Sequence, residues 1–181
     1  MRVRLIAGEF GGRTIDSADR RTTHAMSERA RGALFNSLGA KVQNAYVLDA
    51  FAGSGALGLE ALSRGGAGCV FVEKDRIAAK IITSNVEILG VEARTQIIQA
   101  GVASWCETTR ETEFDLIFAD PPYHNPQLST VARLFGLLKP GGLMVLSHPG
   151  KGEVPTPNGI VVVDNRSYGN LHLTFFRRED V

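Results

Sequence analysis

Four consecutive residues, Asp120-Pro121-Pro122-Tyr123, are suited to holding a planar amine. The prolines lack N–H groups, so the backbone there offers mainly carbonyl acceptors, and an ionised Asp120 is also acceptor-only. Tyr123 adds a flat ring on which a nucleobase can stack. Two acceptors can bind both hydrogens of an exocyclic NH2 group and turn its lone pair toward an electrophile. The four residues therefore indicate an amine-binding site, the simpler alternative being a rigid turn with a half-buried tyrosine.

A glycine-rich turn, Gly53-Ser54-Gly55, is a second candidate for ligand binding. Glycine permits a tight turn and lets a ligand approach the backbone without meeting a Cβ atom. The spacing to Gly58 satisfies the GxGxxG pattern of dinucleotide sites, and Glu73 follows about 20 residues later, where such sites have an acid for the ribose. A lone GxGxxG pattern is weak evidence, so a glycine turn without a ligand stays open as the alternative.

The polar residues follow short apolar runs that predict β-strands. Tyr46 to Leu48 precede Asp49, the run 69–73 ends in Glu73, and the run 114–119 precedes Asp120. Further strands are predicted at 95–99, 143–147, 160–163 and 171–176, the last two antiparallel to each other. Helices are predicted after the glycine turn, from the Asp75 cap to Gly90, and from Asn125-Pro126 to Leu138, before the stop signal Lys139-Pro140-Gly141-Gly142.

Alternating strands and helices with continuous apolar strands predict a parallel sheet covered on both faces. The antiparallel pair at the end makes the sheet mixed. Ligands of such sheets collect at the carboxyl ends of the strands. Because Asp49, the glycine turn, Glu73 and Asp120 all follow predicted strands, we expect them at one edge of the sheet.

The first 40 residues differ from the rest in charge and pattern. A β-hairpin is predicted at 2–16 with its turn at Gly11-Gly12, then a polar irregular segment at 17–26. Ser27 is the predicted N-cap of a helix that ends at Gly39. The predicted buried face of this helix consists of Ala30, Ala33, Leu34, Ser37 and Leu38. Residues 1–31 hold seven arginines against four acidic residues, which indicates either a solvated basic face or an anion-binding surface.

The composition excludes several classes of protein. The chain has 181 residues, of which 44% are hydrophobic and 22% charged, as expected of one globular domain and not of a disordered chain. The net charge of +1 gives no global nucleic-acid signal. Cys69 and Cys106 are solitary and the four histidines show no metal-ligand spacing, so we expect no metal. No run has the length of a membrane span or the pattern of a signal peptide, and we expect a cytoplasmic protein.

The glycine turn, Glu73 and Asp-Pro-Pro-Tyr together resemble the class I S-adenosylmethionine-dependent methyltransferases, in particular those that methylate amino groups. An NAD dehydrogenase could share the glycine spacing but has no use for Asp-Pro-Pro-Tyr. Over the whole chain the sequence is similar to the RsmD family, through LIAGEFGGRTI, SERARGALFNSLG, LDAFAGSGALGLEALSRG and Tyr168-Gly169. Those enzymes methylate the exocyclic N2 of one guanine in 16S ribosomal RNA, guanine 966 in the usual count.

The resemblance implies a role for each matching residue. The catalytic residues would be Asp120, Pro121, Pro122 and Tyr123. S-adenosylmethionine would be bound by Asp49, Ala50, Phe51, Gly53, Ser54, Gly55, Glu73, Lys74, Gly101, Val102 and Asp120. Since Ala100-Gly101-Val102 contains no acid, we expect backbone groups to recognise adenine. The basic leading segment would contact RNA phosphates through Arg2, Arg4, Arg13, Arg29 and Arg31.

The resemblance also implies the architecture and the partners. We expect a Rossmann-like class I methyltransferase fold with a mostly parallel seven-stranded sheet, helices on both faces and a C-terminal antiparallel hairpin. The chain would be one methyltransferase domain, 1–181, with an N-terminal extension at 1–40 and a catalytic core at 41–181. Its partner would be 16S rRNA or the small ribosomal subunit, bound by a monomer. The alternatives are an adenine-N6 or other amino methyltransferase acting on DNA or protein, and a catalytically silent nucleotide-binding assembly factor.

Overall fold

The computed structural model describes residues 1–18, 26–109, 113–150, 154 and 156–179. Most of the irregular segment predicted at 17–26, with Arg20, Arg21 and His24, lies outside the described residues. Within the described part, no helix has the length and apolar character needed to cross a membrane.

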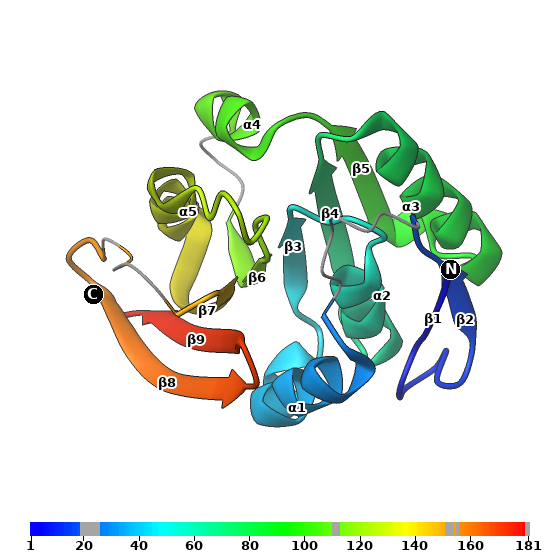
Figure 1. The fold of residues 1–181 in the computed structure, drawn as a ribbon, viewed down its shortest axis with the longest axis horizontal. Coiled ribbons are helices and arrows are strands. Elements are labelled where there is room, and N and C mark those ends of the chain that lie inside the picture. Colours follow the sequence, from blue (N-terminus) through cyan, green and yellow to red (C-terminus); the bar gives the residue numbers. More distant parts are fainter. Residues whose placement is uncertain (19–25, 110–112, 151–153, 155, 180–181) are drawn as a thin grey trace.

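A seven-stranded sheet forms the centre of the structure (Figure 1). The strands are β3 (Tyr46–Ala50), β4 (Gly68–Glu73), β5 (Thr95–Gln99), β6 (Phe114–Ala119), β7 (Leu138–His148), β8 (Ile160–Tyr168) and β9 (Leu171–Arg178). They lie in the order β5-β4-β3-β6-β7-β9-β8, parallel from β5 to β7, whereas β9 is antiparallel to both of its neighbours. The predicted mixed sheet with a closing antiparallel hairpin is therefore confirmed.

Two apolar cores cover the two faces of the sheet. The helices are α1 (Glu28–Leu38), α2 (Ala56–Ser63), α3 (Arg76–Leu89), α4 (Val102–Thr108) and α5 (Leu128–Leu134), with 3-10 turns η1 (Gly39–Val42), η2 (Glu92–Arg94) and η3 (Phe135–Leu137). Residues of α1, α2 and α3 pack in one core, and residues of α4, α5 and η3 in the other. In β3, Val47 faces the first core and Leu48 the second, which is why the strands are apolar without alternation.

The N-terminal hairpin is a separate two-stranded sheet that is tied to the helices beside it. Its strands are β1 (Arg2–Arg4) and β2 (Thr14–Asp16), and Leu5 and Ile15 are buried in the first core. The backbone N–H of Asp16 donates to the side chain of Asn85 on α3, which donates back to the Asp16 carbonyl, both at 2.9 Å. The loop of the hairpin is held by Glu60 on α2. The hairpin is thus fixed along its length.

Helix caps agree with the sequence, although one buried face does not. Ser27 Oγ accepts from the N–H of Ala30, and an Asp75 carboxylate oxygen accepts from the N–H of Ala78, as predicted. Gly39 and Gly90 follow the ends of α1 and α3 with positive φ angles. In α1, however, the predicted face is rotated, because Arg31 and Phe35 are buried where the sequence predicted Ala33 and Ser37. Burial of Arg31 is made possible by an ion pair with Glu60.

Three elements, α4, α5 and β7, differ from the prediction. The helix predicted from Asn125-Pro126 to Leu138 is shorter: α5 begins at Leu128, after Gln127 in a left-handed conformation, and Leu138 begins β7. The N–H of Asn125 donates to the Pro122 carbonyl at 3.0 Å, so this residue closes a turn and does not cap a helix. The predicted stop at 139–142 lies within β7, whose pairing with β6 has an irregular register between Phe114 and Leu116. The short helix α4 was not predicted, and no side chain caps it.

Candidate active site

The carboxyl ends of three neighbouring strands form one wall of a cavity of about 460 Å³. Because β3 lies between β4 and β6 and is parallel to both, Asp49, Glu73 and Asp120 come to the same edge of the sheet. Val3 of the hairpin and Arg31 of α1 also line the cavity. The cavity has the size of a small-molecule site.

Most of the residues predicted for the site line this cavity. They are Asp49, Phe51, Gly53, Ser54, Glu73, Lys74, Gly101, Val102, Asp120, Pro121, Pro122 and Tyr123. Ala50 and Gly55 are not among its lining residues. Arg31, predicted to bind RNA, lines it as well. Residues that were not predicted for any site also line it, namely Val3, Ser17, Ala18, Met26, Ala52, Ala56, Leu57, Val72, Asp75, Ala78, Ala103, His124 and Gln127. Several of these lie on or next to the hairpin or α1, whose proximity depends on tertiary contacts and leaves no local signal in the sequence.

The loop after β3 has an unusual backbone. Phe51 has a φ of 58°, in the left-handed region that a bulky residue seldom adopts, and Gly53 has a φ of 59°. A Cβ atom added to Gly53 would meet nothing within 4 Å, so the space beside this backbone is open. Gly58 has a different role, because an added Cβ would lie 2.4 Å from the Phe71 ring. Gly53 thus opens the cavity and Gly58 lets α2 pack closely on β4.

Two acids fix the shape of this loop. Glu73 accepts from the N–H of Gly53 at 2.9 Å and from the N–H of Asp75 at 2.7 Å, one bond to each carboxylate oxygen. Asp49 is buried and accepts from the N–H of Gly58 at 2.9 Å. Burial, and secondarily the charges of Asp120 and Glu73, raise the pKa of Asp49 well above its ordinary value. Each carboxylate oxygen of Glu73 keeps further acceptor capacity for a ligand.

Asp120 and Tyr123 follow the carboxyl end of β6, and each has a different hydrogen-bond partner. Burial raises the pKa of Asp120 to about 6, and a hydrogen bond with Ser147 partly opposes that rise. The Tyr123 hydroxyl donates to the Asn170 carbonyl at 2.9 Å, in the turn between β8 and β9. The orientation of the tyrosine ring is therefore linked to the C-terminal hairpin.

The five arginines predicted to bind RNA have different environments. Arg29 is exposed, as is Arg2, whose guanidinium lies 4.0 Å from Asp16. Arg4 makes a two-fold contact with Glu28 at 2.8 and 2.9 Å. Arg13 donates to the Ile88 carbonyl at 3.0 Å. Arg31 differs from the other four, because its side chain is 2% exposed and paired with Glu60, so it is not part of the exposed basic surface.

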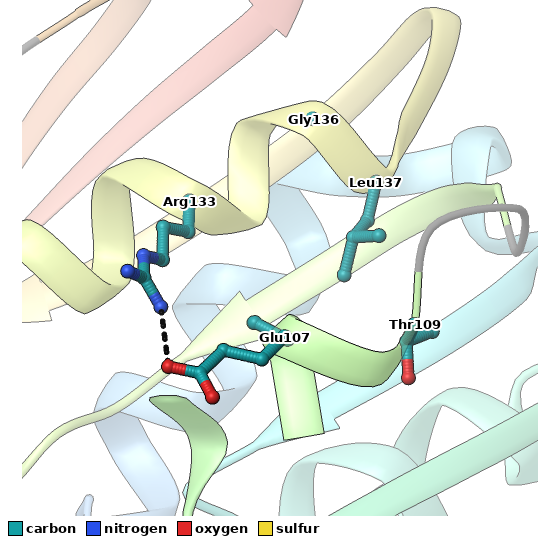
Figure 2. Close-up of a pocket in the computed structure, with 6 residues that line it drawn as sticks. Glu107, Thr109, Arg133, Gly136 and Leu137 are labelled. Carbon is teal, nitrogen blue, oxygen red and sulfur yellow. Dashed lines mark ion pairs between the residues drawn. The ribbon is translucent and has the colours of Figure 1, made fainter. Parts of the chain in front are cut away.

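A second hollow of about 380 Å³ lies between α4 and the segment of α5 and η3 (Figure 2). Arg133 and Glu107 point toward each other across it and form an ion pair at 3.7 Å. The remaining lining residues are Cys106, Thr109, Gly136 and Leu137. The hollow contains none of the residues indicated by the sequence, and its two charges already pair with each other.

Comparison with known proteins establishes the family. A family model described as "Conserved hypothetical protein 95" matches residues 3–177. The chain belongs to this family. It is 31% identical to Ribosomal RNA small subunit methyltransferase D of Escherichia coli strain K12 over 157 residues, 85% of this chain and 78% of that protein. It is also 31% identical over 182 residues to YlbH of Bacillus subtilis, named as a candidate rRNA methyltransferase, covering 97% and 99% of the two chains. The predicted membership of the RsmD family is thus confirmed.

A solved structure supports the same conclusion for the fold. The chain superposes on yhhF of Escherichia coli, described as a candidate methyltransferase, with a TM-score of 0.90 over 100% of both chains at 29% identity. The architecture of this RsmD-family chain is accordingly the Rossmann-like class I methyltransferase fold, as predicted.

Proposed function

We propose that this chain transfers the methyl group of S-adenosylmethionine to the exocyclic N2 amine of a guanine in 16S ribosomal RNA of the small subunit. The observation that carries the proposal is the convergence of Asp120-Pro121-Pro122-Tyr123 with the glycine loop and Glu73 on one cavity. An amine acceptor site and a nucleoside-sized cofactor site are thereby within reach of each other.

The cavity fits the predicted cofactor in charge and shape. The open backbone at Gly53 leaves room beside the loop, where a Cβ would otherwise project. Glu73 suits the ribose hydroxyls, since its oxygens can accept hydrogen bonds beyond those from Gly53 and Asp75. The carboxylates of Glu73 and Asp120 make this end of the cavity acidic, which favours the cationic part of the cofactor. When bound, S-adenosylmethionine supplies an electrophilic methyl group on a sulfonium.

The residues of the chain would act on the amine. A guanine N2 amine is a poor nucleophile because its lone pair is delocalised into the ring. Asp120 and the Pro121 carbonyl would accept its two hydrogens, which localises the lone pair as positive charge develops on nitrogen. The proton is lost more easily after transfer than before it. Asp120 is therefore needed as an ionised acceptor and not as a base that acts first.

The target base must leave its stack to reach this cavity. Tyr123 would provide the surface on which it stacks, and the bond from its hydroxyl to Asn170 would hold the ring in place. Exposed arginines of the hairpin and of α1, Arg2 and Arg29, would contact phosphates without reading sequence.

The decisive experiment is transfer of radiolabelled methyl from S-adenosylmethionine to three substrates: deproteinised 16S RNA, small subunits from a strain lacking the enzyme, and unmethylated duplex DNA. Label recovered as N2-methylguanosine from RNA or subunits is the expected result, and the better substrate reveals the assembly state recognised. Label in DNA adenine would replace the proposal with an adenine-N6 activity. Cofactor binding with no label in any substrate would favour the silent assembly factor.

A further inference from the structure

Arg31 is a buried cation at the wall of the cavity, and one of its donors has no acceptor. The residue is 1% exposed. One terminal nitrogen donates to Glu60 at 2.8 Å and the other to the Arg4 carbonyl at 2.7 Å. Among the described residues, the Nε–H alone of the buried side-chain polar groups finds no partner. A buried donor of this kind is costly unless something accepts from it.

The charges around Arg31 do not cancel. Glu60 is fully buried, and besides Arg31 it pairs with Arg64 at 2.9 Å and accepts from the backbone N–H groups of Ile6 and Ala7. Arg4 is paired separately with Glu28. Three arginines and two glutamates thus form the cluster, which leaves one positive charge in excess. Arg31 is the arginine of this cluster that lines the cavity.

The cavity lining therefore carries both signs of charge. Its acidic residues are Asp49, Glu73, Asp75 and Asp120, and its basic residues are Lys74, beside Glu73, and Arg31, from α1. A ligand with a cationic centre and a separate anionic group matches this arrangement. S-adenosylmethionine has both, a sulfonium and an ammonium on one hand and the carboxylate of its methionine part on the other.

Resting on the proposed function, we infer that Arg31 is the cofactor-binding residue that receives the carboxylate of S-adenosylmethionine, with Nε–H as a donor to it. A charge-assisted hydrogen bond of this kind satisfies the orphan donor and neutralises the excess charge. Glu60 is then a positioning residue, because it holds the guanidinium by one terminal nitrogen and leaves the Nε edge unused. The same carboxylate anchors the hairpin loop through Ile6 and Ala7, so the hairpin and the cofactor site share one support.

The test compares two ligands that differ only in this carboxylate, S-adenosylmethionine and its decarboxylated form, by isothermal titration calorimetry. The wild-type protein should bind the carboxylated ligand more tightly by about tenfold or more. In Arg31→Gln this ratio should fall close to one, while the affinity for the decarboxylated ligand changes little. Arg31→Lys keeps a cation for Glu60 and lacks the Nε donor, so the ratio of the two ligand affinities should also fall in this variant. It replaces Arg31→Gln in the test if Arg31→Gln does not fold.

Arg64→Gln is the matched control, because it removes the other cationic partner of Glu60 and does not line the cavity. Its ligand ratio should stay at the wild-type value even if its melting temperature falls. Equal weakening of both ligands by Arg31→Gln would assign Arg31 a purely structural role and overturn the inference, as would equal affinities in the wild type. Binding of neither ligand by the wild-type protein would instead refute the proposed function itself.

Discussion

Asp120 combines partial burial with a requirement for charge. Its position among acceptors suits an amine only while the carboxylate is ionised, yet burial raises its pKa to about 6. The hydrogen bond with Ser147 stabilises the ionised form. The carboxyl group of Asp120 is therefore ionised above a pH of about 6 and loses its function as an acceptor below it.

Replacing Asp120 by alanine should remove the carboxylate that accepts a hydrogen bond from the substrate amine and leave the rest of the cofactor cavity in place. We expect Asp120→Ala to lower kcat by about 10²-fold or more, the size found for single groups that stabilise developing charge. The affinity for S-adenosylhomocysteine, measured by calorimetry, should change much less. Asp120→Asn, which keeps one acceptor oxygen, is the control and should retain more activity. An equal loss of cofactor binding and turnover in Asp120→Ala would contradict the catalytic role.

The same residue predicts a dependence of rate on pH. Below a pH of about 6 the carboxyl becomes protonated and one acceptor is converted into a donor, so methyl transfer should decline on the acid side of the profile. The measurement is kcat/KM for RNA between pH 5 and 8 at constant ionic strength. In Asp120→Asn this acid limb should disappear. A wild-type limb that persists unchanged in the variant would show that another group titrates.

At the scale of elements, α2 packs closely on β4 at Gly58. An added Cβ at Gly58 would lie 2.4 Å from Phe71 and 2.6 Å from the Cys69 sulfur, both on β4. We expect Gly58→Ala to lower the free energy of unfolding by about 1–3 kcal/mol, the usual cost of overpacking a core. Gly136→Ala is the matched control, since an added Cβ there meets nothing within 4 Å. Urea denaturation followed by circular dichroism measures both; equal stabilities would refute this account of Gly58.

The elements that the sequence predicted well are those with a local signal. Apolar runs ending in an acid located β3 and β4, and the Ser27 and Asp75 caps located the starts of α1 and α3. The predicted start of α5 was wrong because the N–H of Asn125 donates to the Pro122 carbonyl. The same residue can either cap a helix or close a turn, and here it closes a turn. The buried face of α1 was misjudged for a different reason: Arg31 is buried only because Glu60, 29 residues away, receives it.

For the molecule as a whole, the predicted basic surface is smaller than the count of arginines suggests. Arg31 is buried and paired with Glu60, and Arg4, although exposed, is paired with Glu28. Arg2 and Arg29 are exposed, and Arg2 lies 4.0 Å from Asp16. The cavity wall shows the same dependence on distant contacts. The strand-end residues were predictable because parallel strands bring their carboxyl ends together. Val3 and Ser17 instead reach the cavity through the docking of the hairpin, and Met26 through the placement of α1, which it precedes.

Salt dependence of RNA binding can test which arginines take part. We expect Arg2→Gln and Arg29→Gln each to reduce the slope of log affinity against log salt by about 0.7–0.9, the value for one phosphate contact. Arg133→Gln, on α5 beside Glu107, is the control and should leave the slope unchanged. The measurement is fluorescence anisotropy of a labelled 16S fragment over a series of salt concentrations. A slope that is unchanged in both variants would mean that the basic segment is a solvated surface that does not contact RNA phosphates.

The order of the strands has a consequence for biosynthesis. β9 follows β8 in the chain but lies inside it in the sheet, between β7 and β8 (Figure 1). While the nascent chain emerges, β7 therefore has no partner on that side until residues 171–178 leave the ribosome. Premature pairing of β7 with β8 would have to be undone before β9 could enter. We expect ribosome-bound chains stalled shortly before residue 171 to be sensitive to protease, and chains with all of β9 exposed to become resistant.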